Sequence, residues 1–351
     1  MHKPAILYAL ASAALFGIST PAAKVLLGAI SPIVLAGLLY CGAGIGVALL
    51  RRFARGVLQP SAAPQVAVNR KDVPWLVGAI AAGGIAGPLM LMFGLAQTDA
   101  ATASLLLAFE GAATALIAWF VFHENFDRRI ALGMVCIVAG AIILAWSGKP
   151  TLQNAIGPLA IICACVAWGI DNNLTRKVSL ADPLRIVELK GLVAGPVNLA
   201  LGLWAGGLLP AAFPAVLAMS VGFLGYGVSL ALFVVSLRYL GAARTGAYFS
   251  TAPFLGAVTA VIALGEPIIL QLLAAGVLMA LGVWLHVTEH HEHEHIHEPM
   301  MHAHPHVHDE HHQHAHGPED PPGEPHTHSH EHQPVKHAHP HAPDMHHLHR
   351  H

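Results

Sequence analysis

The chain has 351 residues, 55% of them hydrophobic and 11% charged, and its formal net charge is −2 at pH 7. This balance, without a basic cluster, excludes a nucleic-acid-binding surface, and the lack of a phosphate-binding loop or a nucleophile triad gives no reason to expect an enzyme. Up to about residue 288 the apolar sequence leaves helices without a polar face, which excludes a soluble globular domain. We therefore expect a polytopic membrane protein followed by a different kind of segment.

Ten apolar runs are long enough to cross a bilayer, since a spanning helix needs about 20 apolar residues. The joints between them include a basic linker, 51–71, and a polar hinge near 148–157. The sequence therefore predicts an all-α membrane protein with ten transmembrane helices. The predicted spans are about 4–27, 31–50, 74–97, 101–123, 128–147, 155–176, 184–206, 213–237, 243–264 and 267–287.

The second half of the membrane part repeats the first. Displaced by 142 positions, the end of the fourth span falls on the end of the ninth, with Glu124 on Glu266. Gly17 in the first span follows an aromatic residue, as Gly169 does in the sixth. The sequence therefore divides into two five-helix repeats and a tail, at 1–147, 155–287 and 288–351.

Lys and Arg gather in alternate joints, which sets the orientation in the membrane. With the N-terminus in the cytoplasm, the outer joints hold only Lys24 and Lys149. Five spans per repeat then invert the second repeat relative to the first, as in secondary transporters whose substrate site lies between the repeats. We expect a multi-pass protein of the inner (plasma) membrane with both termini cytoplasmic. The inner joints hold Arg51, Arg52, Arg55, Arg70, Lys71, Arg128, Arg129, Arg176, Lys177, Arg185, Arg238 and Arg244.

These features together resemble the drug/metabolite transporter superfamily, EamA type. They are the aromatic-glycine pair in the first span of each repeat, a glutamate closing each fourth span, and small residues along each fifth span (Gly133, Gly140, Gly276 and Gly282). The resemblance implies a central cavity, with the fifth and tenth spans as scaffold or homodimer contact. It also implies alternating access and export of small metabolites. Gly17, Gly169, Glu124 and Glu266 then form a structural repeat motif, in which each glutamate caps or braces a helix junction.

Glu110 is the first candidate for the substrate pathway because it lies near the middle of the fourth span. A charge at the bilayer centre costs at least about 2.5–3.5 kcal/mol, so it must face a cavity or a partner. It is either a proton-coupling or cation-binding carboxylate or a structural glutamate within the bundle. Its repeat counterpart is Ala252, next to Pro253, whose missing N–H would expose a carbonyl in mid-span.

Asp171 and Asn172 follow Gly169 near the end of the sixth span, with Asn173 next to them. Three consecutive polar residues cannot all face lipid, so they either line the pathway or cap the helix. Glu188 and Lys190, in the seventh span, each need a partner of their own, and Arg185 lies one turn before Glu188.

The tail has almost no apolar residues and many prolines, so we expect it to be disordered. Its histidine pattern recurs after 35 residues. Neutral imidazole is a ligand for Zn²⁺, Ni²⁺, Co²⁺ and Cu²⁺, which predicts bound divalent metal, although no cofactor is required. The predicted ligands are His291, His293, His295, His297, His302, His304, His306, His326, His328, His330, His332, His337, His339 and His341.

Three functions follow from these observations. The first is a secondary carrier that exports small solutes, with divalent metal (Ni, Co or Zn) efflux as its specific form. The second is a metabolite or amino-acid exporter whose tail senses metal. The third is a membrane-anchored metal sensor or store that transports nothing, against which the inverted repeat argues because an anchor needs one span.

Overall fold

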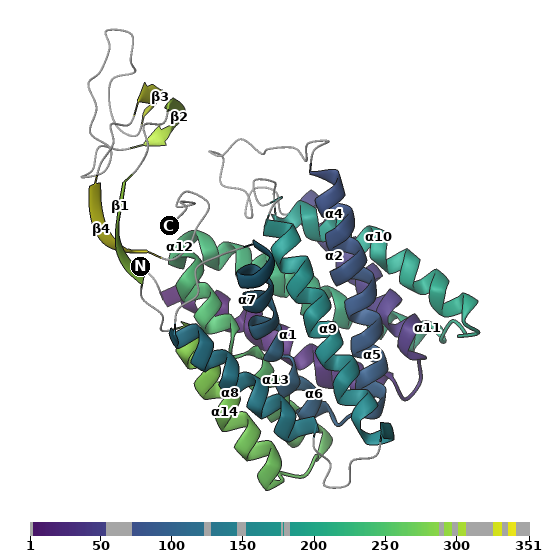
Figure 1. Cartoon of the computed structure of the whole chain (residues 1–351). Helices are drawn as coiled ribbons and strands as arrows, with labels where there is room; N and C mark the ends of the chain where they lie inside the picture. Colours follow the sequence, from purple (N-terminus) through teal and green to yellow (C-terminus); the bar gives the residue numbers. More distant parts are fainter. Residues whose placement is uncertain are drawn as a thin grey trace. The chain divides into compact units, whose positions relative to one another are not determined.

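The computed structural model of the chain describes residues 3–53, 72–122, 128–145, 152–176, 178 and 183–287, and in the tail 291–296, 301–306, 326–331 and 336–341. The described part before residue 288 consists of helices joined by short turns (Figure 1). The helical part and the tail are separate units, so each is described by itself. The helices are α1 (Lys3–Leu26), α2 (Pro32–Phe53), α4 (Val73–Ala79), η1 (Ile80–Ala86), α5 (Gly87–Gln97), α6 (Ala100–Leu106), α7 (Phe109–Phe122), α8 (Arg128–Ala145), α9 (Leu152–Arg176), α10 (Pro183–Trp204), α11 (Ala212–Gly222), η2 (Phe223–Val228), α12 (Ser229–Phe249), α13 (Ala252–Leu264) and α14 (Leu270–Val287).

Seven helical stretches of the described chain are long and apolar enough to cross a membrane, which confirms an all-helical, multi-pass protein. Three shorter apolar helices stand where the fifth, ninth and tenth spans are predicted. The count of ten spans and their orientation stay predictions. The seven stretches are Pro4–Leu26, Pro32–Phe53, Val73–Gln97, Ala100–Val121, Ala155–Thr175, Leu184–Trp204 and Ala212–Phe233.

The predicted fourth span is interrupted in its middle. Helix α6 ends at Leu106 and α7 begins at Phe109. Between them the backbone tightens, because the Ala108 N–H donates to the Leu105 carbonyl at 3.0 Å, three residues back instead of four. The break therefore places the N-terminus of a half-helix inside the span.

The joint predicted at 238–242 is wrong, because α12 continues through it to Phe249. Small residues and a single glycine do not end a helix that contains no proline. The chain breaks instead at Ser250 and Thr251, whose hydroxyls donate to carbonyls of the preceding turn at 2.6 Å. Under the 142-residue displacement Ser250 falls on Ala108, so this break overlaps the break of the fourth span.

Two π-helical segments also occupy the same place in the two repeats. The displacement puts Ala86, the last residue of η1, on Val228, the last residue of η2. A π-helical turn bonds each N–H five residues back, so it changes which backbone carbonyls are left for other donors. Such turns are frequent at functional sites.

The first helix of each repeat packs against the other repeat. Helix α1 lies against η2, α12 and α13, whereas α9 lies against α4, η1, α5 and α7. A Cβ on Gly17 would lie 3.0 Å from the Gly256 nitrogen, and one on Gly169 would lie 3.0 Å from the Thr114 nitrogen. These glycines allow the close approach of α1 to α13 and of α9 to α7, so the two repeats interlock.

Two further seams depend on small residues. Helices α2 and α10 meet at Gly44 and Gly191, where a Cβ on Gly191 would lie 2.5 Å from the Gly44 nitrogen. Helices α8 and α14 run side by side (Figure 1), and a Cβ on Gly282 would lie 2.6 Å from the Gly133 carbonyl oxygen. The small residues predicted as a scaffold or dimer contact therefore join the fifth and tenth helices of one chain.

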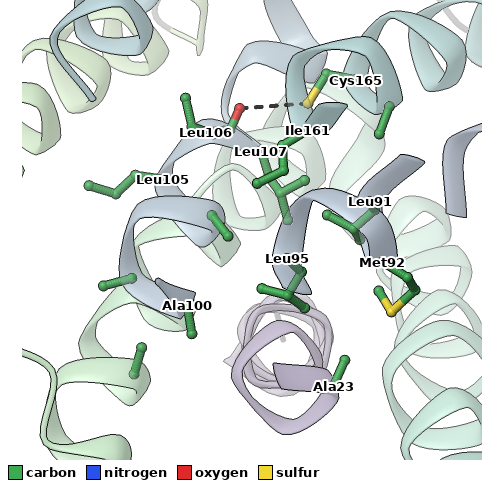
Figure 2. Packing of buried hydrophobic residues seen from close by; sticks show 14 of the residues in the cluster. Ala23, Leu91, Met92, Leu95, Ala100, Leu105, Leu106, Leu107, Ile161 and Cys165 are labelled. Atoms are coloured by element: carbon green, nitrogen blue, oxygen red, sulfur yellow. Dashed lines mark hydrogen bonds between the residues drawn. The ribbon is translucent and has the colours of Figure 1, made fainter. Parts of the chain in front are cut away.

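The largest buried cluster includes residues of α1, α5, α6 and α9 and extends to α2, α8, α11, α13 and α14. Figure 2 shows Ala23, Leu95, Ala100 and Ile161 converging from α1, α5, α6 and α9. Leu95 and Ile161 are fully buried although they lie in membrane-length helices, so this surface belongs to the interior and not to the lipid-facing side.

In the tail, four stretches are strands, where the composition predicts disorder. Alternation of histidine with other residues has the period of a strand, which is compatible with this geometry. Strand β1 (His291–Ile296) pairs antiparallel with β4 (Lys336–His341), and β2 (Met301–His306) pairs antiparallel with β3 (His326–Glu331). In both pairs, histidine lies opposite histidine: His291 and His341, His293 and His339, His295 and His337, His302 and His330, His304 and His328, and His306 and His326.

We expect Gly44→Val to lower the free energy of unfolding by about 1–3 kcal/mol, because the added side chain would meet the backbone of Gly191. The measurement is thermal unfolding of the purified protein in detergent. Gly246→Ala is the matched control, because nothing lies within 4 Å of a Cβ there and alanine favours the helix by about 1 kcal/mol. Equal midpoints for Gly44→Val and the unmodified chain would contradict the seam.

Candidate functional site

Glu110 lies in the first turn of α7, directly after the break in the fourth span. Its half-buried carboxylate accepts a hydrogen bond at Oε1 from Asn172 Nδ2 at 2.9 Å. Asn172 Nδ2 also donates to Thr114 Oγ1 at 3.2 Å, and Thr114 Oγ1 donates to the Glu110 carbonyl at 2.9 Å. The partner of Glu110 thus comes from α9, in the other repeat. The N-terminal end of a helix favours a negative charge, which suits the carboxylate at this position.

The break also leaves carbonyls that other helices use. The Cys165 thiol of α9 donates to the Leu106 carbonyl at 3.6 Å, drawn as the dashed line in Figure 2. Helix α9 therefore contacts both sides of the break, Leu106 before it and Glu110 after it.

Asp171 is an ion-pair partner of Lys190, which the sequence left without one. Lys190 Nζ lies 2.5 Å from Asp171 Oδ1, and Thr175 Oγ1 donates to the same oxygen at 2.8 Å. Lys190 also donates to Thr175 Oγ1 at 3.0 Å. A Cβ on Gly83 would collide with the Asp171 carboxylate, so this carboxylate lies against the backbone of η1. Asp171 is 7% exposed, and the pair joins α9 to α10 below the surface.

The three consecutive polar residues of α9 have different surroundings. Asn173 is 4% exposed and donates to the carbonyls of Thr114 at 3.0 Å and Gly169 at 2.8 Å. Asn172 is exposed. Asp171 and Asn173 thus face packed helices, and Asn172 is the member that presents a polar surface beside Glu110.

The π-helical segment η1 is a second centre of polar contacts. The Gly83 carbonyl accepts from Tyr40 Oη at 2.8 Å and from Trp168 Nε1 at 3.0 Å. The Gly84 carbonyl accepts from Asn198 Nδ2 at 2.9 Å. Donors from α2, α9 and α10 thus converge on two neighbouring carbonyls.

A series of aromatic ring contacts connects Tyr40, next to η1, with residues of the second repeat. The ring of Tyr40 lies 5.8 Å from that of Tyr226, which lies 5.9 Å from that of Phe16. Phe16 in turn lies 5.3 Å from Phe249. Trp168 and Phe16, the aromatic partners of the two repeat glycines, therefore pack against corresponding regions, η1 and η2, of opposite repeats.

Glu188 forms ion pairs with two arginines. Its Oε1 lies 2.6 Å from Arg185 Nη1, and its Oε2 pairs with Arg51 Nη1 of α2. The sequence indicated Arg185 but not Arg51, which lies far away along the chain. This cluster lies at the ends of α2 and α10 where arginines gather.

The opposite end of the bundle has a different pair of contacts. Glu266 accepts hydrogen bonds from the N–H groups of Ala100 and Ala101, each at 2.7 Å, at the start of α6. Lys24 Nζ donates to the carbonyls of Leu95 at 2.7 Å and Thr98 at 2.8 Å, at the end of α5. The α5–α6 junction is thus held by an anion at a helix N-terminus and a cation at a helix C-terminus.

The remaining predicted residues before the tail are Pro253 and Glu124. Pro253 lies in the first turn of α13, where its missing N–H leaves no helical bond unmade, so the expected mid-helix defect is absent. Glu124 lies outside the described residues.

The described residues contain no group of three or more His, Cys, Asp or Glu side chains that could hold a metal ion. Glu110 and Asp171 therefore have no third ligand of this kind in that part of the chain. Of the predicted tail ligands, His297 and His332 lie outside the described residues, and the other twelve occupy the strands. Metal binding by the tail stays a prediction.

Sequence reasoning missed Thr114, Tyr40 and Asn198. Thr114 had a detectable signal, because it lies one turn after Glu110. Tyr40 and Asn198 are single polar residues in apolar helices, and only the fold brings them to η1.

Comparison with known proteins gives three findings. The model of the EamA-like transporter family matches residues 3–146 and 155–288. An uncharacterized transporter from Methanothermobacter thermautotrophicus is 28% identical over 283 residues, covering 77% of this chain and 82% of the relative. A crystal structure of another protein is similar in fold, with a TM-score of 0.58 and 19% identity, covering 82% of this chain and 96% of that one.

Glu266→Gln should lower the free energy of unfolding by about 1 kcal/mol, because an amide cannot replace both carboxylate oxygens at the start of α6. Thermal unfolding in detergent measures it. Asp99→Asn is the control, because Asp99 is the N-cap of the same helix but makes no side-chain cap bond. An equal loss of stability in Asp99→Asn and Glu266→Gln would show that the two hydrogen bonds of Glu266 do not stabilise the junction.

Proposed function

The chain belongs to the EamA-like transporter family, whose model matches both repeats, and on that premise we propose that it exports a small solute across the plasma membrane by alternating access. The proposed pathway passes Glu110 and Asn172. It lies between the repeats, at the depth where secondary transporters of inverted-repeat architecture bind their substrates.

The contact of Glu110 with Asn172 is the observation that carries this proposal. It joins α7 to α9 beside a broken span, and half-helix ends are the places where transporters of this architecture bind charged groups. Asn172 is exposed although it lies within the apolar stretch Ala155–Thr175, and an exposed amide there would be unfavourable against lipid, which supports a water-accessible path.

The distribution of polar contacts supports access from one end. Glu188 pairs with arginines near the start of α10, and Lys190 further along α10 pairs with Asp171 of α9. Asn172, the next residue of α9, donates to Glu110 of α7. At the other end, Lys24 of α1 and Glu266, two residues after the end of α13, bind the α5–α6 junction. Alternating access would require the contacts of Lys24 and Glu266 to open when the path past Glu188, Asp171 and Glu110 closes.

The tail enters the proposal as a metal-binding segment that senses or buffers divalent metal. The histidine-against-histidine register of its strands favours this role. The same register supports the alternative of divalent metal efflux, in which the tail delivers its ion to the helices. The third alternative, a sensor or store that transports nothing, predicts no flux at all.

We expect Glu110→Gln to reduce solute flux at least tenfold, because it removes the carboxylate that accepts a hydrogen bond from Asn172 on the proposed path. The measurement is efflux from proteoliposomes loaded with a panel of labelled metabolites, amino acids and amines, and with Ni²⁺, Co²⁺ or Zn²⁺. A chain ending at residue 288 should keep metabolite flux. Asp99→Asn, which removes a carboxylate elsewhere, should keep it as well.

Flux of no solute by the unmodified chain would overturn the carrier and favour the sensor. Flux of metal ions that is lost both in Glu110→Gln and in the shortened chain would favour metal efflux over the metabolite carrier.

The full chain should bind Ni²⁺ or Zn²⁺ near pH 7.5, and the chain ending at residue 288 should bind far less. Only neutral imidazole is a metal ligand, and unperturbed imidazole has a pKa of about 6.5, so binding should weaken as pH falls through 6.5. Equilibrium dialysis at pH 7.5 and pH 5.5 measures it. Equal binding by the two chains would contradict the proposed role of the tail.

A further inference from the structure

We infer that the site at Glu110 takes an organic solute with a single positive charge, an ammonium or guanidinium group on an apolar body, and not a divalent metal ion. This inference rests on the proposed function and names the substrate class of the same site. Four observations lead to it: the charge balance around Glu110, an open acceptor oxygen, the number of metal ligands, and the aromatic rings nearby.

The charges around Glu110 do not cancel. Among the residues whose side chains the structure describes, its charged neighbours are Asp171 of α9 and Lys190 of α10. These two pair with each other at 2.5 Å and share Thr175, so their charges neutralise one another. When Glu110 is ionised, its compensation is the neutral amide of Asn172 and the N-terminal end of α7, and no full positive charge of a described residue is left for it. The site therefore has a deficit of one positive charge, which a monovalent cation would supply.

The carboxylate also has an acceptor oxygen that no described donor uses. Its Oε1 accepts from Asn172, whereas Oε2 accepts no hydrogen bond from any residue that the structure describes. An ionised carboxylate offers two oxygens and about four lone-pair sites. An N–H donor of a cationic solute would find its acceptor at Oε2, while Asn172 fixes the orientation of the group.

The ligand set does not suit a divalent metal. Zn²⁺ sites use three or four N, S or O ligands, and Ca²⁺ sites use six or more oxygens. In the described helices Glu110 has no such companions, and the one nearby carboxylate, Asp171, is engaged by Lys190. A dehydrated divalent ion would remain under-coordinated and would bring one positive charge too many.

Aromatic rings provide the apolar side of the site. Trp168 lies one turn before Asn172 on α9, and i, i+4 residues of a helix share a face. Tyr40 donates to the same Gly83 carbonyl as Trp168, and its ring packs against that of Tyr226. The faces of such rings attract cations, and they bury an apolar body.

The test compares two probes of similar shape and opposite charge. Labelled phenethylamine, a cation at pH 7, and labelled phenylacetate, an anion, are each offered to the full chain in proteoliposomes, with Ni²⁺ as a third probe. We expect uptake of phenethylamine at least tenfold above phenylacetate, and no Ni²⁺ uptake that depends on Glu110. Glu110→Gln should abolish this preference, and Glu110→Asp, which keeps the charge, should retain it at a lower rate.

A second set of variants tests the charge balance itself. Asp171→Asn frees the charge of Lys190 and should weaken phenethylamine binding by about tenfold, since unit charges near each other in a protein interact by a few kcal/mol or less. Adding Lys190→Gln to the same chain removes that charge and should recover most of the loss. Scintillation binding in detergent measures both, and thermal unfolding shows whether each variant folds.

The outcomes separate this inference from the proposed function. Glu110-dependent flux of phenylacetate, of neutral solutes or of Ni²⁺, without flux of phenethylamine, would overturn the cationic substrate and leave the carrier in place. Failure of the double variant to recover binding while it remains folded would overturn the charge balance. Absence of Glu110-dependent flux for every solute tested would overturn the proposed pathway itself.

Discussion

The hydrocarbon interior of a membrane offers no water to a charge, and this constraint governs the polar structure of the protein. Lys190 and Asp171 satisfy it by pairing, and Glu188 satisfies it with arginines from two helices. Glu110 meets it only in part, with an amide as its partner. These four groups belong to one helical bundle. Of the four, Asp171, Glu188 and Lys190 each have a partner of opposite charge, whereas Glu110, between the two repeats, has an amide.

Close approach of helices is the second condition, and small residues provide it. Helix α1 reaches α13 through Gly17, and α9 reaches α7 through Gly169. Because each first helix belongs by packing to the opposite repeat, neither repeat has a complete interior by itself. The Glu110–Asn172 contact follows directly from this exchange, since α9 must cross to the first repeat before Asn172 can reach α7.

The sequence predicted those features that are visible as a repeat or as a local pattern of residues. It indicated the two copies, the glycines of the first spans and Glu110, because each is visible as an alignment or as a charge in an apolar run. It missed the break at Leu107 and Ala108, and it placed the eighth joint too early, because hydropathy does not distinguish a continuous helix from a broken one. The partnership of Lys190 with Asp171 also escaped it, since the spacing of 19 residues gives no helical neighbour and depends on how α9 packs on α10.

The matched π-helical turns have a consequence for the history of the chain. Segments η1 and η2 end at equivalent positions of the two copies, so the irregular turn belonged to the ancestral five-helix unit before it was duplicated. The carboxylate does not share that symmetry, because Ala252 stands where the first copy has Glu110. The two copies therefore share the irregular turn, whereas only the first copy has a carboxylate at the break in its fourth helix.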